Sequence, residues 1–179
     1  GHLDDFALAH IRMIPVDVLN DPFRAAQQPG LISVNGCLMA DLTGQVCAEA
    51  IDGRQYSGVG GQLDFVRAAA RSAGGRSFLC LHSTHEAPDG TLTSNIRAHL
   101  PSGAVVTTPR SDVMYIVTEW GAADLHNQPL ETRICAMIRI AHPRFRCALA
   151  QEAVAWGQLS PERAAQFDTQ PEPEKEETT

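Results

Sequence analysis

The sequence predicts an α/β domain with a mostly parallel sheet flanked by helices. Short apolar runs bounded by turn residues alternate along the chain with segments of helical periodicity, as in βαβ units. The chain has 179 residues, of which 44% are hydrophobic, so it can bury one core of its own. No internal repeat is evident, and we expect a single domain over residues 3–167.

The first predicted element is a short helix over residues 22–28. Asp21 followed by Pro22 is a typical helix start, because proline fits the first helical turn and aspartate suits the capping position. Pro29-Gly30 then ends the helix. Asn20 is therefore expected in the loop that directly precedes this helix.

Two strands, a helix and a buried strand are expected next. The runs 31–42 and 45–52 are short and of mixed polarity, with a turn at Thr43-Gly44 between them. Apolar residues recur at helical spacing in 62–75, a segment that ends in a glycine pair. The compact apolar run 77–81 is typical of a strand buried inside a sheet.

The C-terminal part predicts a loop, two more strands and three helical segments. Residues 82–90 are polar and indicate a loop, whereas 104–107 and 113–118 are rich in β-branched residues. Helical periodicity after an initial proline marks the remaining segments, which are 129–140, 143–154 and a last turn over 161–167.

The basic residues are almost all arginine. Of the 14 Lys+Arg residues only Lys175 is a lysine, and it lies in the acidic segment 168–179. The rest of the chain therefore offers no lysine for a Schiff base, a P-loop or general-base catalysis. The acidic segment has no apolar anchor, so we expect a disordered tail or linker. At the other end, Gly1-His2 is interpreted as a cloning remnant.

Charge and cysteine content exclude several classes of partner. More than half of the formal charge of −7 belongs to the acidic tail, and neither a nucleic-acid footprint nor a polybasic membrane patch is visible. No apolar run approaches the ~20 residues of a membrane span and no signal peptide is seen, so we expect a cytoplasmic protein. The 5 cysteines are widely spaced without a CxxC pair and predict neither a disulfide framework nor a zinc site.

The glycine-rich stretch Ser57–Gly61 is the strongest local signal for chemistry. It leads directly into a predicted helix, whose first N–H groups carry partial positive charge and can hold an anion or a developing oxyanion. It is not a dinucleotide fingerprint, because that pattern needs glycine where Leu63 stands. The alternative is a plain connection from strand to helix in which glycine supplies positive φ.

Glu119 is the second candidate. It follows the predicted strand 113–118, and open α/β sheets place their ligands at the carboxyl ends of strands. The alternative is an ordinary strand-end acid that faces solvent or pairs with an arginine. His82, His85 and Glu86 are residue types that bind metals, but they lack the helical His spacing of zinc proteases, so no metal site is expected.

Five segments share their order and approximate spacing with one enzyme family. They are DLTGQV at 41–46, GRQYSGVGGQLDFVR at 53–67, TTPRSDV at 107–113, VTEWG at 117–121 and IAHPRFR at 140–146. Together they resemble the carboxyl-terminal half of the acetyl-CoA hydrolase/transferase family, which includes acetate, succinate and hydroxybutyrate CoA-transferases. The resemblance implies a CoA-transferase-like (NagB/RpiA-type) fold, in which two related α/β halves enclose the active site.

The resemblance also implies a reaction sequence. In that family a glutamate attacks an acyl-CoA to form an acyl-glutamyl anhydride, CoA returns to give a glutamyl thioester, and an acceptor carboxylate then takes the CoA. The family's glutamate lies upstream of the segment that matches Leu3–Asp21, and Glu49 matches a different acid. The implied partners are an acyl-CoA, a small carboxylate and the N-terminal half of a CoA-transferase, in cis or in trans.

Site residues follow from the same resemblance. Asn20 is expected to donate its side-chain amide to the oxyanion, with the backbone N–H of Gly60 or Gly61 as the second donor. Glu119 is expected to face the reacting thioester. The implied CoA-lining residues are Ser57, Gly58, Val59, Gly60 and Gly61. CoA is a substrate in this scheme, and no covalently bound cofactor is expected.

Departures from the family pattern leave more than one function open. Family members commonly carry a CoA-facing lysine after the strand that matches 77–81, and this chain has none there; Met39 and His82 also depart from the pattern. The first hypothesis is a CoA-transferase half, with acyl-CoA hydrolysis as a variant. The second is a non-catalytic CoA-binding or docking module of a larger assembly. A homodimer is compatible with either hypothesis.

Overall fold

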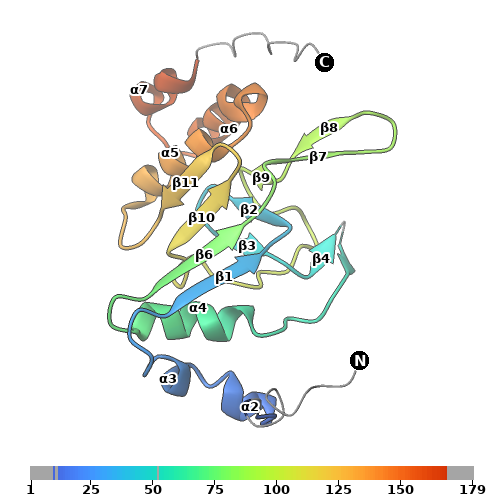
Figure 1. The fold of residues 1–179 in the computed structure, drawn as a ribbon. Coiled ribbons are helices and arrows are strands. Elements are labelled where there is room, and N and C mark those ends of the chain that lie inside the picture. Colours follow the sequence, from blue (N-terminus) through green and yellow to red (C-terminus); the bar gives the residue numbers. More distant parts are fainter. Residues whose placement is uncertain (1–9, 11, 52, 169–179) are drawn as a thin grey trace, which may run out of the picture.

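The main sheet has four strands, of which three are parallel (Figure 1). The computed structural model describes residues 10, 12–51 and 53–168. The strands are β1 (Ile32–Gly36), β6 (Arg76–Cys80), β10 (Tyr115–Thr118) and β11 (Gly121–Asp124). Their order is β1-β6-β10-β11, with β11 antiparallel to β10. The predicted α/β class with a mostly parallel sheet is confirmed.

Smaller β elements lie around this sheet. A second sheet has the order β3-β2-β9, from β2 (Met39–Asp41), β3 (Val46–Cys47) and β9 (Ile96–Arg97). Two hairpins pair β4 (Ala50–Ile51) with β5 (Arg54–Gln55) and β7 (Thr84–Glu86) with β8 (Leu92–Ser94). The β7–β8 hairpin projects from the body of the domain (Figure 1).

Two helices cover the main sheet, and four short or peripheral helical segments complete the described fold. The covering helices are α4 (Gln62–Arg71), which packs on β1 and β6, and α5 (Leu130–Ile140), which packs on β10 and β11. The other segments are α2 (Val16–Leu19), α3 (Pro22–Ala25), α6 (Pro143–Ala155) and α7 (Pro161–Ala164), the last continued by the 3-10 turn η1 (Ala165–Phe167). No helix among these residues is long and apolar enough to cross a membrane.

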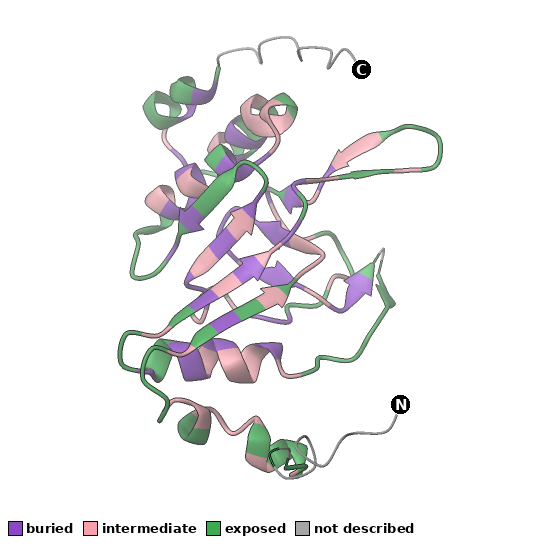
Figure 2. Cartoon of the chain, viewed as in Figure 1, coloured by how far each residue is buried: buried purple, intermediate pink, exposed green. Residues whose placement is uncertain are grey.

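The hydrophobic core lies against one face of the main sheet. Leu79 of β6 and Ile116 of β10 are fully buried and belong to the same cluster as Val66 of α4 and Ile138 of α5. The second sheet contributes Ala40 to this cluster. Buried residues alternate with half-buried ones along β6 and β10, and β1 has one buried residue, Ser33, between exposed neighbours (Figure 2). The opposite face of the sheet is therefore left without a covering layer among the described residues.

Arg133 of α5 makes hydrogen bonds to three loops inside the domain. Its side chain is 9% exposed, and its guanidinium donates to the backbone carbonyls of Thr43, Leu125 and Arg110. The Thr43 carbonyl belongs to the predicted turn, where Gly44 adopts a φ of 91°. Because carbonyl groups from three separate segments depend on one side chain, Arg133 links the second sheet to α5.

The structure corrects several sequence predictions. The predicted helix 22–28 ends at Ala25, and the run 45–52 divides into β3 and β4, which belong to different sheets. The run 31–42 forms two strands in different sheets, because the chain turns after Gly36. Residues 104–107 form no strand. The next residue, Thr108, makes only an isolated β-bridge with Val46. The predicted loop 82–90 contains β7. Strand β11 was not predicted, and the predicted tail beyond Asp168 lies outside the described residues.

Candidate active site

Asn20, Gly60 and Gly61 line one cavity of about 610 Å³ at the start of α4. Asn20 is the residue at which α2 ends, and the Asp21 carboxylate caps α3 by accepting a hydrogen bond from the Phe23 N–H at 2.8 Å. The side chain of Asn20 is thus held at a corner between two short helices. The sequence prediction placed Asn20 before the helix at Pro22, and the structure confirms that position.

Gly61 lies directly beside Asn20. A β-carbon built at position 61 would collide with Nδ2 of Asn20 and would contact the ring of Phe65. The φ of Gly61 is −97°, which any residue can adopt, whereas Gly60 has a φ of 61°. Gly60 is therefore required for its backbone conformation and Gly61 for the space it leaves open. The structure brings together the two groups that the resemblance paired as oxyanion donors.

Helix α4 begins at the carboxyl edge of the main sheet. Gln62 donates from Nε2 to the carbonyl of Gly36 at 2.9 Å, and its Oε1 accepts from the Thr108 hydroxyl at 2.9 Å. Gly36 is the last residue of β1. The N–H groups of the first turn of α4 carry partial positive charge, so this end of the helix favours a developing negative charge.

A buried glutamate braces the glycine-rich loop. Glu49 is 4% exposed, and its carboxylate accepts hydrogen bonds from Gln55 Nε2 at 3.1 Å and from the Thr107 hydroxyl at 3.2 Å. Its backbone carbonyl accepts from the N–H groups of Tyr56 and Ser57, and Gln55 Nε2 also donates to the Ser57 carbonyl at 2.6 Å. Residues 57–60 are exposed beyond this brace. Sequence reasoning separated Glu49 from the nucleophile but missed its bracing contacts.

Glu119 lies in a different shallow hollow, together with Leu81, His82 and Val117. Its carboxylate accepts hydrogen bonds from the Ser83 hydroxyl and from the Ser83 N–H, the latter at 3.0 Å to Oε2. Partial burial opposes ionisation of Glu119, but these hydrogen bonds and the charge of His82 outweigh it and hold the pKa of Glu119 below its ordinary value. Glu119 is thus a carboxylate fixed in position.

Glu119 and the Asn20–Gly61 pair lie at the same edge of the sheet but line separate cavities. Glu119 follows the carboxyl end of β10, while Gly60 and Gly61 directly precede Gln62, whose side chain bonds to the Gly36 carbonyl at the carboxyl end of β1. Ligands of open α/β sheets bind at this edge, so the arrangement fits a ligand that extends across strand ends. The structure confirms the predicted position of Glu119 after its strand.

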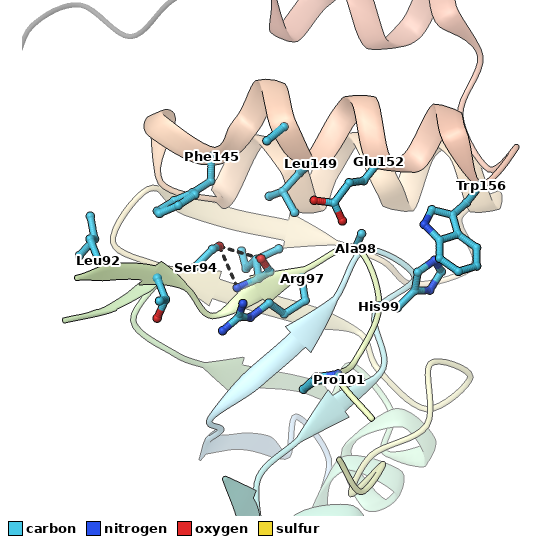
Figure 3. Close-up of a pocket in the computed structure, with 13 residues that line it drawn as sticks. Leu92, Ser94, Arg97, Ala98, His99, Pro101, Phe145, Leu149, Glu152 and Trp156 are labelled. Atoms are coloured by element: carbon cyan, nitrogen blue, oxygen red, sulfur yellow. Dashed lines mark hydrogen bonds between the residues drawn. The ribbon is translucent and has the colours of Figure 1, made fainter. Parts of the chain in front are cut away.

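A third cavity, of about 460 Å³, contains none of the predicted site residues (Figure 3). It lies between α6 and the segment that runs from β8 to Pro101. Its walls are mainly apolar, with Leu149 and Phe145 from α6, and the ring of Trp156 packs edge-on against His99 at 4.3 Å between centroids. We assign no role in the chemistry to this cavity.

The described residues contain no candidate metal centre, although three cysteines lie near one another. Among residues 10, 12–51 and 53–168, no group of three His, Cys, Asp or Glu side chains could hold a metal ion. Cys37, at the end of β1, directs its thiol to the Cys80 carbonyl at 3.6 Å. Burial, with the nearby Cys80 and Cys47 thiols, raises the pKa of Cys37 to about 12.

Comparison with known proteins identifies the family. The family model of the acetyl-CoA hydrolase/transferase C-terminal domain matches residues 3–153. The chain belongs to the acetyl-CoA hydrolase/transferase family. The resemblance carried by the five sequence segments is therefore confirmed.

Curated relatives in this family are CoA-transferases. The chain is 46% identical over 138 residues to a probable butyrate:acetyl-CoA coenzyme A-transferase of Syntrophomonas wolfei, with 77% of this chain and 31% of the relative covered. It is 45% identical over 137 residues to the 4-hydroxybutyrate coenzyme A transferase of Clostridium kluyveri, covering 76% and 31%. The chain thus spans about a third of the length of these relatives.

Solved structures of similar proteins agree with the fold. RipA from Yersinia pestis superposes with a TM-score of 0.72 at 44% identity, over 80% of this chain and 32% of RipA. The 4-hydroxybutyrate CoA-transferase from Porphyromonas gingivalis superposes with a TM-score of 0.63 at 37% identity, over 80% and 31%. Both solved structures therefore share the arrangement of strands and helices over most of this chain.

Proposed function

We propose that this chain is the carboxyl-terminal part of a cytoplasmic acyl-CoA:carboxylate CoA-transferase. It supplies the oxyanion hole and the CoA-binding loop to a glutamate nucleophile on the N-terminal part of the enzyme. The observation that carries the proposal is the contact between the Asn20 amide and Gly61 at the N-terminus of α4. The names of the relatives, a butyrate:acetyl-CoA and a 4-hydroxybutyrate CoA-transferase, support short carboxylic acids as acceptors.

The proposed chemistry begins when the glutamate carboxylate attacks the thioester carbonyl. The carbonyl oxygen then gains negative charge, which the Asn20 amide and the backbone N–H of Gly60 or Gly61 stabilise by donating hydrogen bonds. When the tetrahedral intermediate collapses, the C–S bond breaks and CoA leaves as a thiolate. CoA thiolate then attacks the glutamyl carbonyl of the anhydride, which releases the first acyl group as a free carboxylate and leaves a glutamyl-CoA thioester. The acceptor carboxylate attacks this thioester and expels CoA thiolate, and the thiolate attacks the acceptor's acyl carbonyl in the new anhydride, which gives the product acyl-CoA and frees the glutamate carboxylate. One preorganised donor of this kind contributes about 3–4 kcal/mol to the transition state.

Charges around the Asn20 cavity support the acyl end of the substrate as its occupant. Asp17 and Asp64 line this cavity together with Asn20 and Gly61. These carboxylates repel the permanently charged phosphates of CoA, whereas the thioester carbonyl is neutral before attack. We therefore place the reacting carbonyl here and the pantetheine arm along residues 57–60. Glu119 faces the same strand-end edge and is proposed to lie beside the thioester sulfur.

The test compares this domain with the full-length enzyme that contains it. Exchange between butyryl-CoA and labelled acetate should be catalysed by the full-length enzyme and should be absent with residues 3–168 alone. Turnover by the isolated domain would contradict the shared active site. A full-length protein that binds CoA but transfers nothing would support a CoA-binding module, and release of free CoA without exchange would support a hydrolase.

A further inference from the structure

A chain of hydrogen bonds leads from Trp120 to the Glu119 carboxylate. The indole Nε1–H of Trp120 donates to the Ser83 hydroxyl oxygen at 3.2 Å, and the Ser83 hydroxyl donates to Oε1 of Glu119. An indole N–H can only donate and an ionised carboxylate can only accept, so this chain has a single direction. Because the Ser83 oxygen already accepts the indole N–H, its one proton is directed to Glu119.

Ser83 is held in place at the base of the β7–β8 hairpin. It is fully buried, and its backbone carbonyl accepts a hydrogen bond from the Asn95 N–H at 2.8 Å. Asn95 also donates from Nδ2 to the His82 carbonyl at 2.9 Å. With the backbone of Ser83 fixed in this way, rotation of its hydroxyl is the freedom that remains, and the contact with the indole N–H restricts it.

The segment IAHPRFR at 140–146 holds the Trp120 ring from two sides. The Arg146 guanidinium lies over the ring at 5.7 Å from its centroid, and the His142 ring meets it edge-on at 5.3 Å between centroids. Nε of Arg146 donates to the Ala141 carbonyl at 2.9 Å, which orients the guanidinium. Since the Trp120 residue is 45% exposed, these contacts position its ring more than burial in the core does.

The backbone of Trp120 is joined to the same segment. The Thr118 hydroxyl donates to the Ile140 carbonyl at 2.6 Å and accepts from the Trp120 N–H at 3.1 Å. Thr118 is the last residue of β10, and Ile140 is the last residue of α5. Two of the five segments that carry the family resemblance, 117–121 and 140–146, therefore form one structural unit around Trp120.

We propose that Trp120 is a positioning residue for CoA transfer, because it fixes the Glu119 carboxylate through the Ser83 hydroxyl. The inference rests on the proposed function, in which Glu119 lies beside the thioester sulfur. An N–H that donates to a hydroxyl also polarises it and strengthens the bond that the hydroxyl donates in turn. Loss of the indole N–H therefore loosens the Glu119 carboxylate and leaves the CoA-binding loop 57–61 unchanged.

The experiment measures steady-state CoA exchange by the full-length enzyme that contains this domain. Trp120→Phe removes the indole N–H and keeps an aromatic ring beside Arg146 and His142. It should lower kcat by about two- to ten-fold, the range for one hydrogen bond, and should change KM for acyl-CoA by less than about two-fold. Trp156→Phe, the same substitution at the other tryptophan of this chain, is the matched control and should change neither constant.

Glu119→Gln provides the background that separates positioning from a general loosening of the fold. If Trp120 acts through Glu119, Trp120→Phe should cause no further loss of kcat in this background. A loss by the same factor in both backgrounds would overturn the inference, and so would an unchanged kcat of Trp120→Phe alone.

A spectroscopic readout tests the hydrogen-bond chain independently of activity. In proton–nitrogen correlation spectra of the full-length enzyme with isotope-labelled tryptophan, the Trp120 Nε1–H resonance is assigned by its absence in Trp120→Phe. It should move on Ser83→Ala, while the Trp156 resonance stays. A Trp120 resonance that does not move would overturn the inference even where exchange is normal. A shift in an enzyme that catalyses no exchange would refute the proposed function and support the hydrogen-bond chain.

Discussion

The side-chain amide of Asn20 packs against Gly61 so closely that position 61 has no space for a β-carbon. This contact joins the corner between α2 and α3 to the first turn of α4, two segments about forty residues apart in the chain. Since the φ of Gly61 is ordinary, the glycine is needed for close approach and not for an unusual backbone conformation. Oxyanion stabilisation depends on donors that are held in fixed positions, so the role of this contact can be tested by substitution.

Gly61→Ala should lower turnover of the full-length enzyme by about 100-fold, because the new methyl group displaces the Asn20 amide. Asn20→Ala should lose a similar factor. The two changes remove the same interaction, so the double variant should be no slower than Asn20→Ala alone. Steady-state CoA exchange by all three variants gives this cycle. Multiplicative losses would show that Gly61 acts independently of Asn20.

Thr107→Val should lower the free energy of unfolding by about 1–3 kcal/mol, because the buried Thr107 hydroxyl makes hydrogen bonds to two groups. The hydroxyl donates to Glu49 and accepts from the Ala48 N–H at 2.9 Å. Loosening of this brace should also raise KM for acyl-CoA more than it lowers kcat. Urea denaturation and steady-state kinetics measure the two effects, and Thr107→Ser, which keeps the hydroxyl, serves as the control.

The sequence predicted those features that depend on local spacing. Helix α4 was found because its apolar residues and its terminal glycines lie within one short segment. The brace at Glu49 was missed because Thr107, one of its partners, lies 58 residues away and no local pattern links them. Strand β11 was missed because Gly121–Asp124 is short and has little β-propensity; its pairing with β10 forms it. The Asn20–Gly61 pairing was predicted only through the resemblance to a family.

Ser83→Ala should raise the pKa of Glu119 towards its ordinary value, because a hydrogen bond to the carboxylate is lost. A lowered folded-state pKa adds stability at pH values above the unfolded-state pKa, and this contribution disappears as the pH falls through the folded-state pKa. The stability difference between the parent and the variant should therefore narrow on acidification. Carbon-detected NMR titration of Glu119 and urea denaturation at neutral and acid pH test this; an unchanged pKa would contradict it.

Arg133→Met should lower the free energy of unfolding by about 2–4 kcal/mol, because carbonyl acceptors in three loops lose their donor. Methionine keeps a similar length, so most of the loss is polar. Arg139→Met, on an exposed position of the same helix, should change stability by less than about 0.5 kcal/mol and is the control. Equal effects of the two substitutions on thermal or urea unfolding would contradict a stabilising role of the hydrogen bonds from Arg133.

The ionisation state of Cys37 has a consequence for the proposed CoA-transferase function. Its pKa, raised to about 12 mainly by burial, keeps the thiol protonated at neutral pH. A thioester bound at this strand edge would meet a free thiolate as a competing acyl acceptor, and acyl transfer to it would trap the enzyme in an S-acylated form. In the proposed enzyme, a Cys37 sulfur that stays protonated and hydrogen-bonded to the Cys80 carbonyl does not compete for the acyl group.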